Sequence, residues 1–219
     1  MNPIPFLRRL ADNNNRVWFQ QHRAEFDAVR KQWMDDADRF IAACAAWEPA
    51  YSRFDARAAT YRIYRDTRFS LDKTPYKTYF SLFMSPVGRN SAYSGIYLTA
   101  GLTPDNTCLY GGLWSPESPM LRKLRQAVVD NIEEFEEIIN NPELKALCPE
   151  WEGRRLKTIP KGWPKDHPQA ELLRLIDYGR KIQLDEAFFD DPEWPERAAA
   201  MSRVFKPLND FINYSLFEE

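Results

Sequence analysis

Between Thr60 and Trp114 the sequence changes from helical periodicity to short aromatic and β-branched runs, and this change constrains the fold most. The runs cover residues 61–65, 78–84, 95–100 and 107–110. Turn-forming segments rich in proline, glycine, aspartate and asparagine separate them. Links this short leave no room for the helical crossovers that parallel strands need. The pattern therefore predicts four strands of an antiparallel meander.

Helical patterns flank this central region on both sides. Apolar residues recur at three- and four-residue steps over 15–48 and again over 118–139, as one face of a helix requires. A weaker run at 181–184 predicts a fifth strand, and Pro207 predicts a kink or break in the last helix. We therefore expect a single α+β domain over residues 1–219. Its antiparallel sheet of four or more strands, at about 60–114, is packed by the flanking helices.

Composition excludes several classes of site. The 8 glycines form no G-x-G and no G-x-x-x-x-G-K motif, which excludes a standard Rossmann fingerprint and a P-loop. The three cysteines, Cys44, Cys108 and Cys148, form no C-x-x-C, and only 2 histidines are present. This pattern predicts reduced thiols, no metal and no cofactor. With neither a signal peptide nor an apolar run of membrane-spanning length, we expect a cytoplasmic protein without a membrane partner.

Charge is distributed unevenly along the chain. The net charge is −2, yet residues 61–80 carry five cations against two carboxylates, a balance of +3, and residues 150–165 have the same balance. Local basic patches on an acidic protein favour a small anionic ligand over a long polyanion, so nucleic acid is not the expected partner. The sequence predicts no particular oligomeric state.

The densest polar segment, residues 62–77, is the candidate site. Arginine grips carboxylate or phosphate with two parallel hydrogen bonds, and tyrosine supplies neutral donors and flat surfaces. The sequence thus predicts a basic, tyrosine-lined pocket for a phosphate- or carboxylate-bearing ligand. The candidate ligand-binding residues are Arg62, Tyr64, Arg65, Asp66, Arg68, Asp72, Lys73, Tyr76, Lys77 and Tyr79.

Two other interpretations of the same segment stay open. Asp66 and Asp72 can pair internally with arginines and clamp a hairpin, which we favour for Arg65. Two carboxylates cannot neutralise five cations, however, so a surplus of positive charge is expected. The basic loop could instead belong to a non-catalytic module that docks an acidic protein surface or nucleic acid. No catalytic residue is assigned, and His167 is a helix cap, a satisfied packing residue, or a general acid or base.

Several motifs together carry a resemblance to a known family. They lie at residues 13–19, 62–77, 110–116, 121–125 and 160–168. On these motifs the chain resembles the domain-of-unknown-function family 2461 over nearly its whole length. The resemblance implies one α+β domain and implies no activity.

Overall fold

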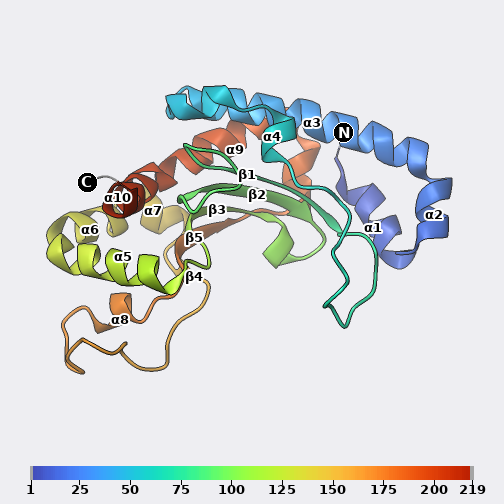
Figure 1. Cartoon of the computed structure of the whole chain (residues 1–219). Coiled ribbons are helices and arrows are strands. Elements are labelled where there is room, and N and C mark those ends of the chain that lie inside the picture. The colour runs from blue at the N-terminus through green and yellow to red at the C-terminus, as the bar shows by residue number, and fades with distance from the viewer. Residues whose placement is uncertain (1, 218–219) are drawn as a thin grey trace. The chain divides into compact units, whose positions relative to one another are not determined.

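The computed structural model describes residues 2–217, and the chain can be followed in Figure 1. It forms two compact units. Unit 1 comprises Met1–Arg89, Tyr97–Leu109 and Gln183–Arg203, and unit 2 comprises Asn90–Ile96, Tyr110–Ile182 and Val204–Glu219. Each unit contains its own helices and its own buried apolar side chains. The expectation of a single domain stays a prediction.

One antiparallel sheet has five strands in the order β1-β2-β3-β5-β4. The strands are β1 (Tyr79–Met84), β2 (Gly95–Gly101), β3 (Cys108–Leu113), β4 (Trp151–Glu152) and β5 (Tyr178–Gln183). Strands β1 to β3 are neighbours in chain order, as a meander requires, and β5 covers most of the run expected at 181–184. The α+β fold with an antiparallel sheet of at least four strands is therefore confirmed.

Residues 61–65 do not form the regular first strand that their pattern predicts. They lie next to two isolated antiparallel bridges, Thr60 with Leu82 and Tyr64 with Tyr76. The ladder does not continue beyond Tyr64 and Tyr76, because Pro75 has no N–H to donate to a facing strand. The loop at residues 66–74 is held by side-chain contacts instead. The sheet instead gains β4 and β5, which lie far beyond Trp114 in the sequence.

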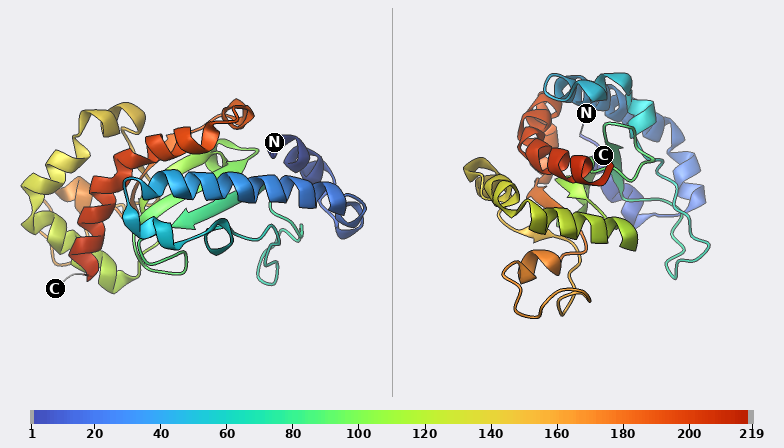
Figure 2. Two further views of the ribbon diagram at one scale, coloured as in Figure 1. Left: turned by 90° about the horizontal axis from the view of Figure 1, so that it is seen from above. Right: turned by 60° about the vertical axis from the view of Figure 1, so that its left-hand side comes forward.

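In unit 1, helices pack against the apolar side chains of β1. Trp33 stacks on Phe80 of β1, with 5.5 Å between ring centroids, and on Trp194, with 5.7 Å. These tryptophans belong to two helices that lie side by side in Figure 2. The helices of this unit are α1 (Ile4–Asp12), α2 (Arg16–Gln21), α3 (Arg23–Ala45), α4 (Ala56–Ala59) and α9 (Trp194–Ser202).

The helix expected over 15–48 is interrupted at His22. Asn15 caps α2 as expected, because its side chain accepts a hydrogen bond from the Trp18 backbone N–H at 3.0 Å. The His22 ring then stacks on the Trp18 indole, with 4.0 Å between centroids, and its Nδ1 lies 2.9 Å from the Trp18 carbonyl oxygen. This local side-chain contact competes with helix continuation and separates α2 from α3.

In unit 2, helices surround a core that includes Leu124, Phe135, Tyr178, Leu208 and Ile212. The stripe expected over 118–139 forms two helices rather than one, since Asn131 leaves helical geometry between them. The final helix begins with Pro207 in its first turn, where proline is tolerated. The helices are α5 (Ser118–Asp130), α6 (Ile132–Ile139), α7 (Pro142–Leu147), α8 (Ala170–Leu173) and α10 (Lys206–Phe217).

Over residues 2–217, none of the helices is long and apolar enough to cross a membrane. In the same part of the chain, histidine, cysteine, aspartate and glutamate side chains form no group of three or more that could hold a metal ion.

We expect the native protein to resist thiol labelling. All three cysteines are buried, and none of them forms a disulfide within residues 2–217. Burial raises the pKa of Cys148 to about 11 and raises the pKa of Cys44 further. Because the thiolate is the reactive form, a disulfide-exchange reagent at about pH 8 should find no thiol before unfolding. It should find all three in urea. A disulfide in protein purified without oxidant would contradict this prediction.

Candidate functional site

The basic segment begins with a hairpin that is closed by backbone hydrogen bonds. The Arg65 N–H donates to the Pro75 carbonyl oxygen at 2.9 Å, and the Lys77 N–H donates to the Ile63 carbonyl oxygen at 2.7 Å. Between these bonds the chain runs out and back through residues 66–74. The loop tip exposes apolar side chains, and Phe69 is 95% exposed.

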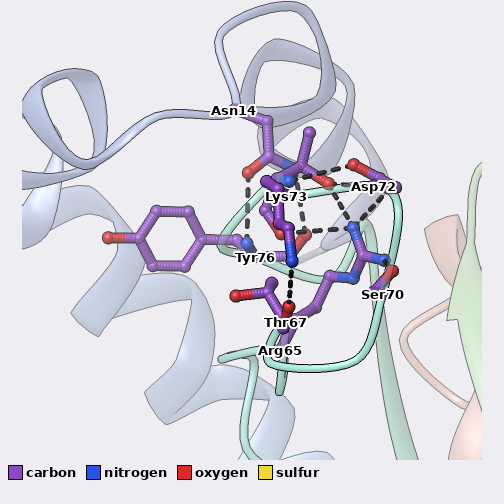
Figure 3. Close-up of polar contacts among 8 residues, drawn as sticks. Asn14, Arg65, Thr67, Ser70, Asp72, Lys73 and Tyr76 are labelled. Carbon is purple, nitrogen blue, oxygen red and sulfur yellow. Dashed lines mark hydrogen bonds and ion pairs between the residues drawn. The ribbon is translucent and has the colours of Figure 1, made fainter.

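Side chains lock the interior of this loop (Figure 3). The Arg65 guanidinium donates to the Asp72 carboxylate, to the Thr74 hydroxyl, and to the Thr74 carbonyl oxygen at 3.1 Å. Asp72 also accepts the Thr74 N–H at 2.9 Å. The Thr74 backbone and hydroxyl donors, followed by Arg65, lower the pKa of Asp72 to about 2. The clamp interpretation is therefore confirmed for Arg65 and Asp72.

Two further cations of the loop are engaged locally. Arg68 donates to Asp66 from Nε at 3.0 Å and from a terminal nitrogen at 2.6 Å, and this contact lowers the pKa of the Asp66 carboxyl. The Lys73 ammonium donates to the Thr67 carbonyl oxygen at 2.9 Å, as Figure 3 shows. Both carboxylates of the segment are thus paired, each with one arginine.

Two of the predicted tyrosines pack against the N-terminal helices. The Asn14 amide donates to the Tyr76 carbonyl oxygen at 2.9 Å and accepts the Tyr76 N–H at 3.1 Å, so it replaces a strand partner. Phe19 stacks on the buried Tyr76 ring at 4.0 Å between centroids. The Tyr64 hydroxyl accepts a hydrogen bond from Arg23 at 3.1 Å. These contacts fix the base of the hairpin on α2 and α3.

The remaining cations form a second group, which we name the cationic cluster: Arg62, Lys77 and Arg89, with the rings of Tyr61 and Tyr79. The Lys77 Nζ lies 5.4 Å from the Tyr61 ring centroid and 5.6 Å from the Tyr79 ring centroid. The Arg89 guanidinium lies 5.0 Å from the Tyr61 centroid and donates to the Thr60 carbonyl oxygen. All of these residues belong to unit 1.

No carboxylate in the described chain forms an ion pair with any of the three cations of this cluster. Burial lowers the pKa of the Lys77 ammonium, and the positive charges of Arg62 and Arg89 lower it further. The Arg89 Nε is buried without a hydrogen-bond partner. Burying a charge without a counterion, or a donor without an acceptor, costs folding free energy. A bound anion would supply both partners.

The structure therefore divides the ten predicted site residues into three groups. Arg62, Lys77 and Tyr79 lie in the cationic cluster, and Tyr64 and Tyr76 pack on the helices. Arg65, Asp66, Arg68, Asp72 and Lys73 hold the loop. Arg89 and Tyr61 were missed, since Arg89 lies outside the dense segment and reaches the cluster only through the β1–β2 connection.

A family model described as a conserved hypothetical protein (DUF2461) matches residues 2–211. This chain belongs to the DUF2461 family. The resemblance inferred from the sequence motifs is thereby confirmed. No curated protein and no solved structure matches the chain.

The other motifs of this DUF2461 member have structural contacts in unit 2. His167 Nδ1 accepts the Gln169 N–H at 3.0 Å, and its ring packs against Trp163. Gln169 occupies the N-cap position of α8 without a side-chain capping bond, so the contacts of His167 are those of a packing residue rather than of a helix cap. The buried Arg125 donates to the Leu175 carbonyl oxygen at 2.7 Å. In this DUF2461 chain these residues join separate segments of one unit.

Proposed function

We propose that this DUF2461 protein binds a small phosphate- or carboxylate-bearing anion at the cationic cluster. The observation that carries the proposal is the grouping of Arg62, Lys77 and Arg89, none of which forms an ion pair with a carboxylate within residues 2–217. Arginine offers planar paired donors that match both anions, and lysine adds a point charge. The proposed ligand is a small molecule rather than a membrane or a nucleic acid.

The loop-locking contacts support this assignment of roles. Arg65 forms an ion pair with Asp72, and Arg68 forms one with Asp66. The positive charges of these two arginines are therefore already compensated. The locked loop instead fixes the two chain segments that carry Arg62 and Lys77, which lie one on each side of it. We therefore assign ligand contact to the cationic cluster and positioning to the loop.

Anion-dependent stability tests the proposal. A ligand that binds only the folded state stabilises it by about 2.7 kcal/mol at one hundred times its Kd. For a chain of this length that corresponds to a Tm increase of roughly 5–10 °C. We expect phosphate to raise the Tm more than chloride does at equal ionic strength, and Arg62→Ala to remove the difference.

Arg68→Ala is the matched control, since it removes an arginine from the same segment whose guanidinium is 77% exposed and paired with Asp66. Phosphate also stabilises proteins by exclusion from their surface, and that part appears in every variant. If Arg68→Ala loses the specific phosphate effect while Arg62→Ala keeps it, the loop and not the cationic cluster holds the anion. An identical response in all three proteins would exclude a specific anion site.

The loop tip favours a second candidate function, docking of an acidic protein surface or of nucleic acid. Phe69 and Leu71 are almost fully exposed beside Arg68, and exposed apolar side chains mark an interaction site where they form a contiguous patch. Such docking requires Phe69 and Leu71. The small-anion site does not, so changes at the tip separate the two candidates.

We also propose a cytoplasmic location. The support is that Cys44, Cys108 and Cys148 are buried and form no disulfide within the described residues, which suits a reducing compartment.

A further inference from the structure

We propose that Lys77 is a nucleophilic amine that forms an imine with a carbonyl-bearing anion held by Arg62 and Arg89. This inference rests on the proposed function and names the class of ligand for the same site. Its basis is the placement of one half-buried lysine against two tyrosine rings, where the charges of Arg62 and Arg89 act on its amine.

Lys77 differs from Lys31, Lys73 and Lys123 in how its amine is engaged. Lys73 donates to the Thr67 carbonyl oxygen, and Lys123 donates to the Leu216 carbonyl oxygen at 2.8 Å. Lys31 forms an ion pair with Asp35 at 2.6 Å. Across residues 2–217, the contacts recorded for the Lys77 Nζ are the faces of Tyr61 and Tyr79. Once the ammonium has lost a proton, no hydrogen-bond donor among these residues occupies the lone pair of the nitrogen.

The surroundings of Lys77 also favour the neutral amine. Burial lowers the pKa of its ammonium, and the charges of Arg62 and Arg89 act in the same direction. The tyrosine rings attract the ammonium and oppose this effect in part. Desolvation and neighbouring cations are the two ways in which proteins activate lysine toward carbonyl carbon.

The reaction is a condensation without a change of oxidation state. The neutral Lys77 nitrogen attacks the carbonyl carbon, a C–N bond forms, and the π electrons of the carbonyl move to oxygen, which takes a proton from nitrogen. Loss of water then leaves a C=N bond. Amine and carbonyl are thus converted to imine and water, and no oxidant or reductant is required.

The arginines select the ligand class. Two guanidinium groups near the amine hold an anionic group, so the carbonyl must lie on a molecule that also carries phosphate or carboxylate. An aldehyde phosphate or a 2-oxo acid satisfies both requirements. A neutral aldehyde satisfies only one of them.

Pyridoxal 5′-phosphate is a suitable probe, since it combines an aldehyde with a phosphate. The wild-type protein is incubated with it, reduced with borohydride to trap any imine, and mapped by peptide mass spectrometry. We expect Lys77 to be modified about tenfold faster than Lys73 at neutral pH. Inorganic phosphate should compete, Arg62→Ala should lower the rate at Lys77, and pyridoxal without phosphate should show little preference.

The outcomes separate this inference from the proposed function. If phosphate raises the Tm through Arg62 but Lys77 is modified no faster than Lys73, the nucleophile is refuted and the anion site stands. If Lys77 is modified fast but phosphate does not slow the modification, the proposal that Arg62 and Arg89 select anionic ligands is refuted. If phosphate has no specific effect on Tm and Lys77 shows no preference, both proposals fail.

Discussion

Replacing Asp177 with alanine is expected to lower the free energy of unfolding by about 2–4 kcal/mol, because two backbone donors lose their acceptor. The Asp177 side chain is fully buried, and its carboxylate accepts four hydrogen bonds. The Ser115 N–H donates at 2.7 Å, while Arg154 donates its backbone N–H and two guanidinium nitrogens at 2.8 Å each. Alanine would leave the two backbone donors without a partner, and unmade hydrogen bonds of partly buried groups are expensive.

Chemical denaturation measures this effect, and Asp210→Ala is the matched control in the same unit. Asp210 pairs with Lys206 on the surface of α10, and its side chain is 54% exposed. Exposed pairs contribute about 1 kcal/mol or less, so we expect the control to unfold nearly as wild type does. If the two variants lose the same free energy of unfolding, the hydrogen bonds by which Asp177 links Ser115 to Arg154 do not stabilise the fold.

The contribution of Asp177 should also depend on pH. Burial by itself raises the pKa of this carboxyl, but the bonds from Arg154 and Ser115 outweigh it and leave the pKa below its ordinary value. Folding therefore favours the ionised form, and the stabilisation is fully present above the unfolded pKa of about 3.9. It is lost as pH falls through the lower, folded pKa. The difference between wild type and Asp177→Ala should stay constant from neutral pH down to about 5 and shrink below about 4.

Replacing Gly112 with alanine is expected to cost about 4 kcal/mol or more, since strain and overlap add. Gly112 has φ +136°, a conformation that residues with a Cβ rarely adopt. A Cβ there would also lie 2.3 Å from the Gly179 Cα and 2.3 Å from the Tyr178 carbonyl oxygen. Those atoms belong to the backbone of β5, so no side chain can rotate away. Reduced soluble yield and a lower Tm would report the effect.

Gly162→Ala separates the two causes. Gly162 has φ +98°, but a Cβ at this position has no atom within 4 Å. It therefore carries the backbone strain alone, for which we expect about 1–2 kcal/mol. If Gly112→Ala destabilises no more than Gly162→Ala, the close approach of β3 to β5 does not restrict the residue at 112.

The candidate site was predictable as a segment but not as a set of contacts. A surplus of cations over carboxylates in residues 61–80 can be counted in the sequence, and a pairing of Arg65 with Asp66 or Asp72 follows from their places in one loop. The structure selects Asp72. Which cations stay uncompensated depends on geometry. Arg68 lies two residues from Asp66 and binds it. Arg62 and Lys77 form no ion pair with either carboxylate within residues 2–217, although the charge of Arg62 contributes to lowering the pKa of Asp66. Arg89 joins them only because the β1–β2 connection returns beside Thr60.

By itself, the sequence determined the α+β class, the antiparallel sheet, the helix stripes and the excess of basic charge, because periodicity, turn residues and charge are local properties. Tertiary structure decided what depends on distant partners. Strand β5 completes the sheet where residues 61–65 do not, and Asn14 supplies a hydrogen-bond partner to Tyr76 from 62 residues away. The cationic cluster is of the same kind: its cations come together only when the hairpin closes and Arg89 docks on Thr60, since charges separated in sequence interact only through space.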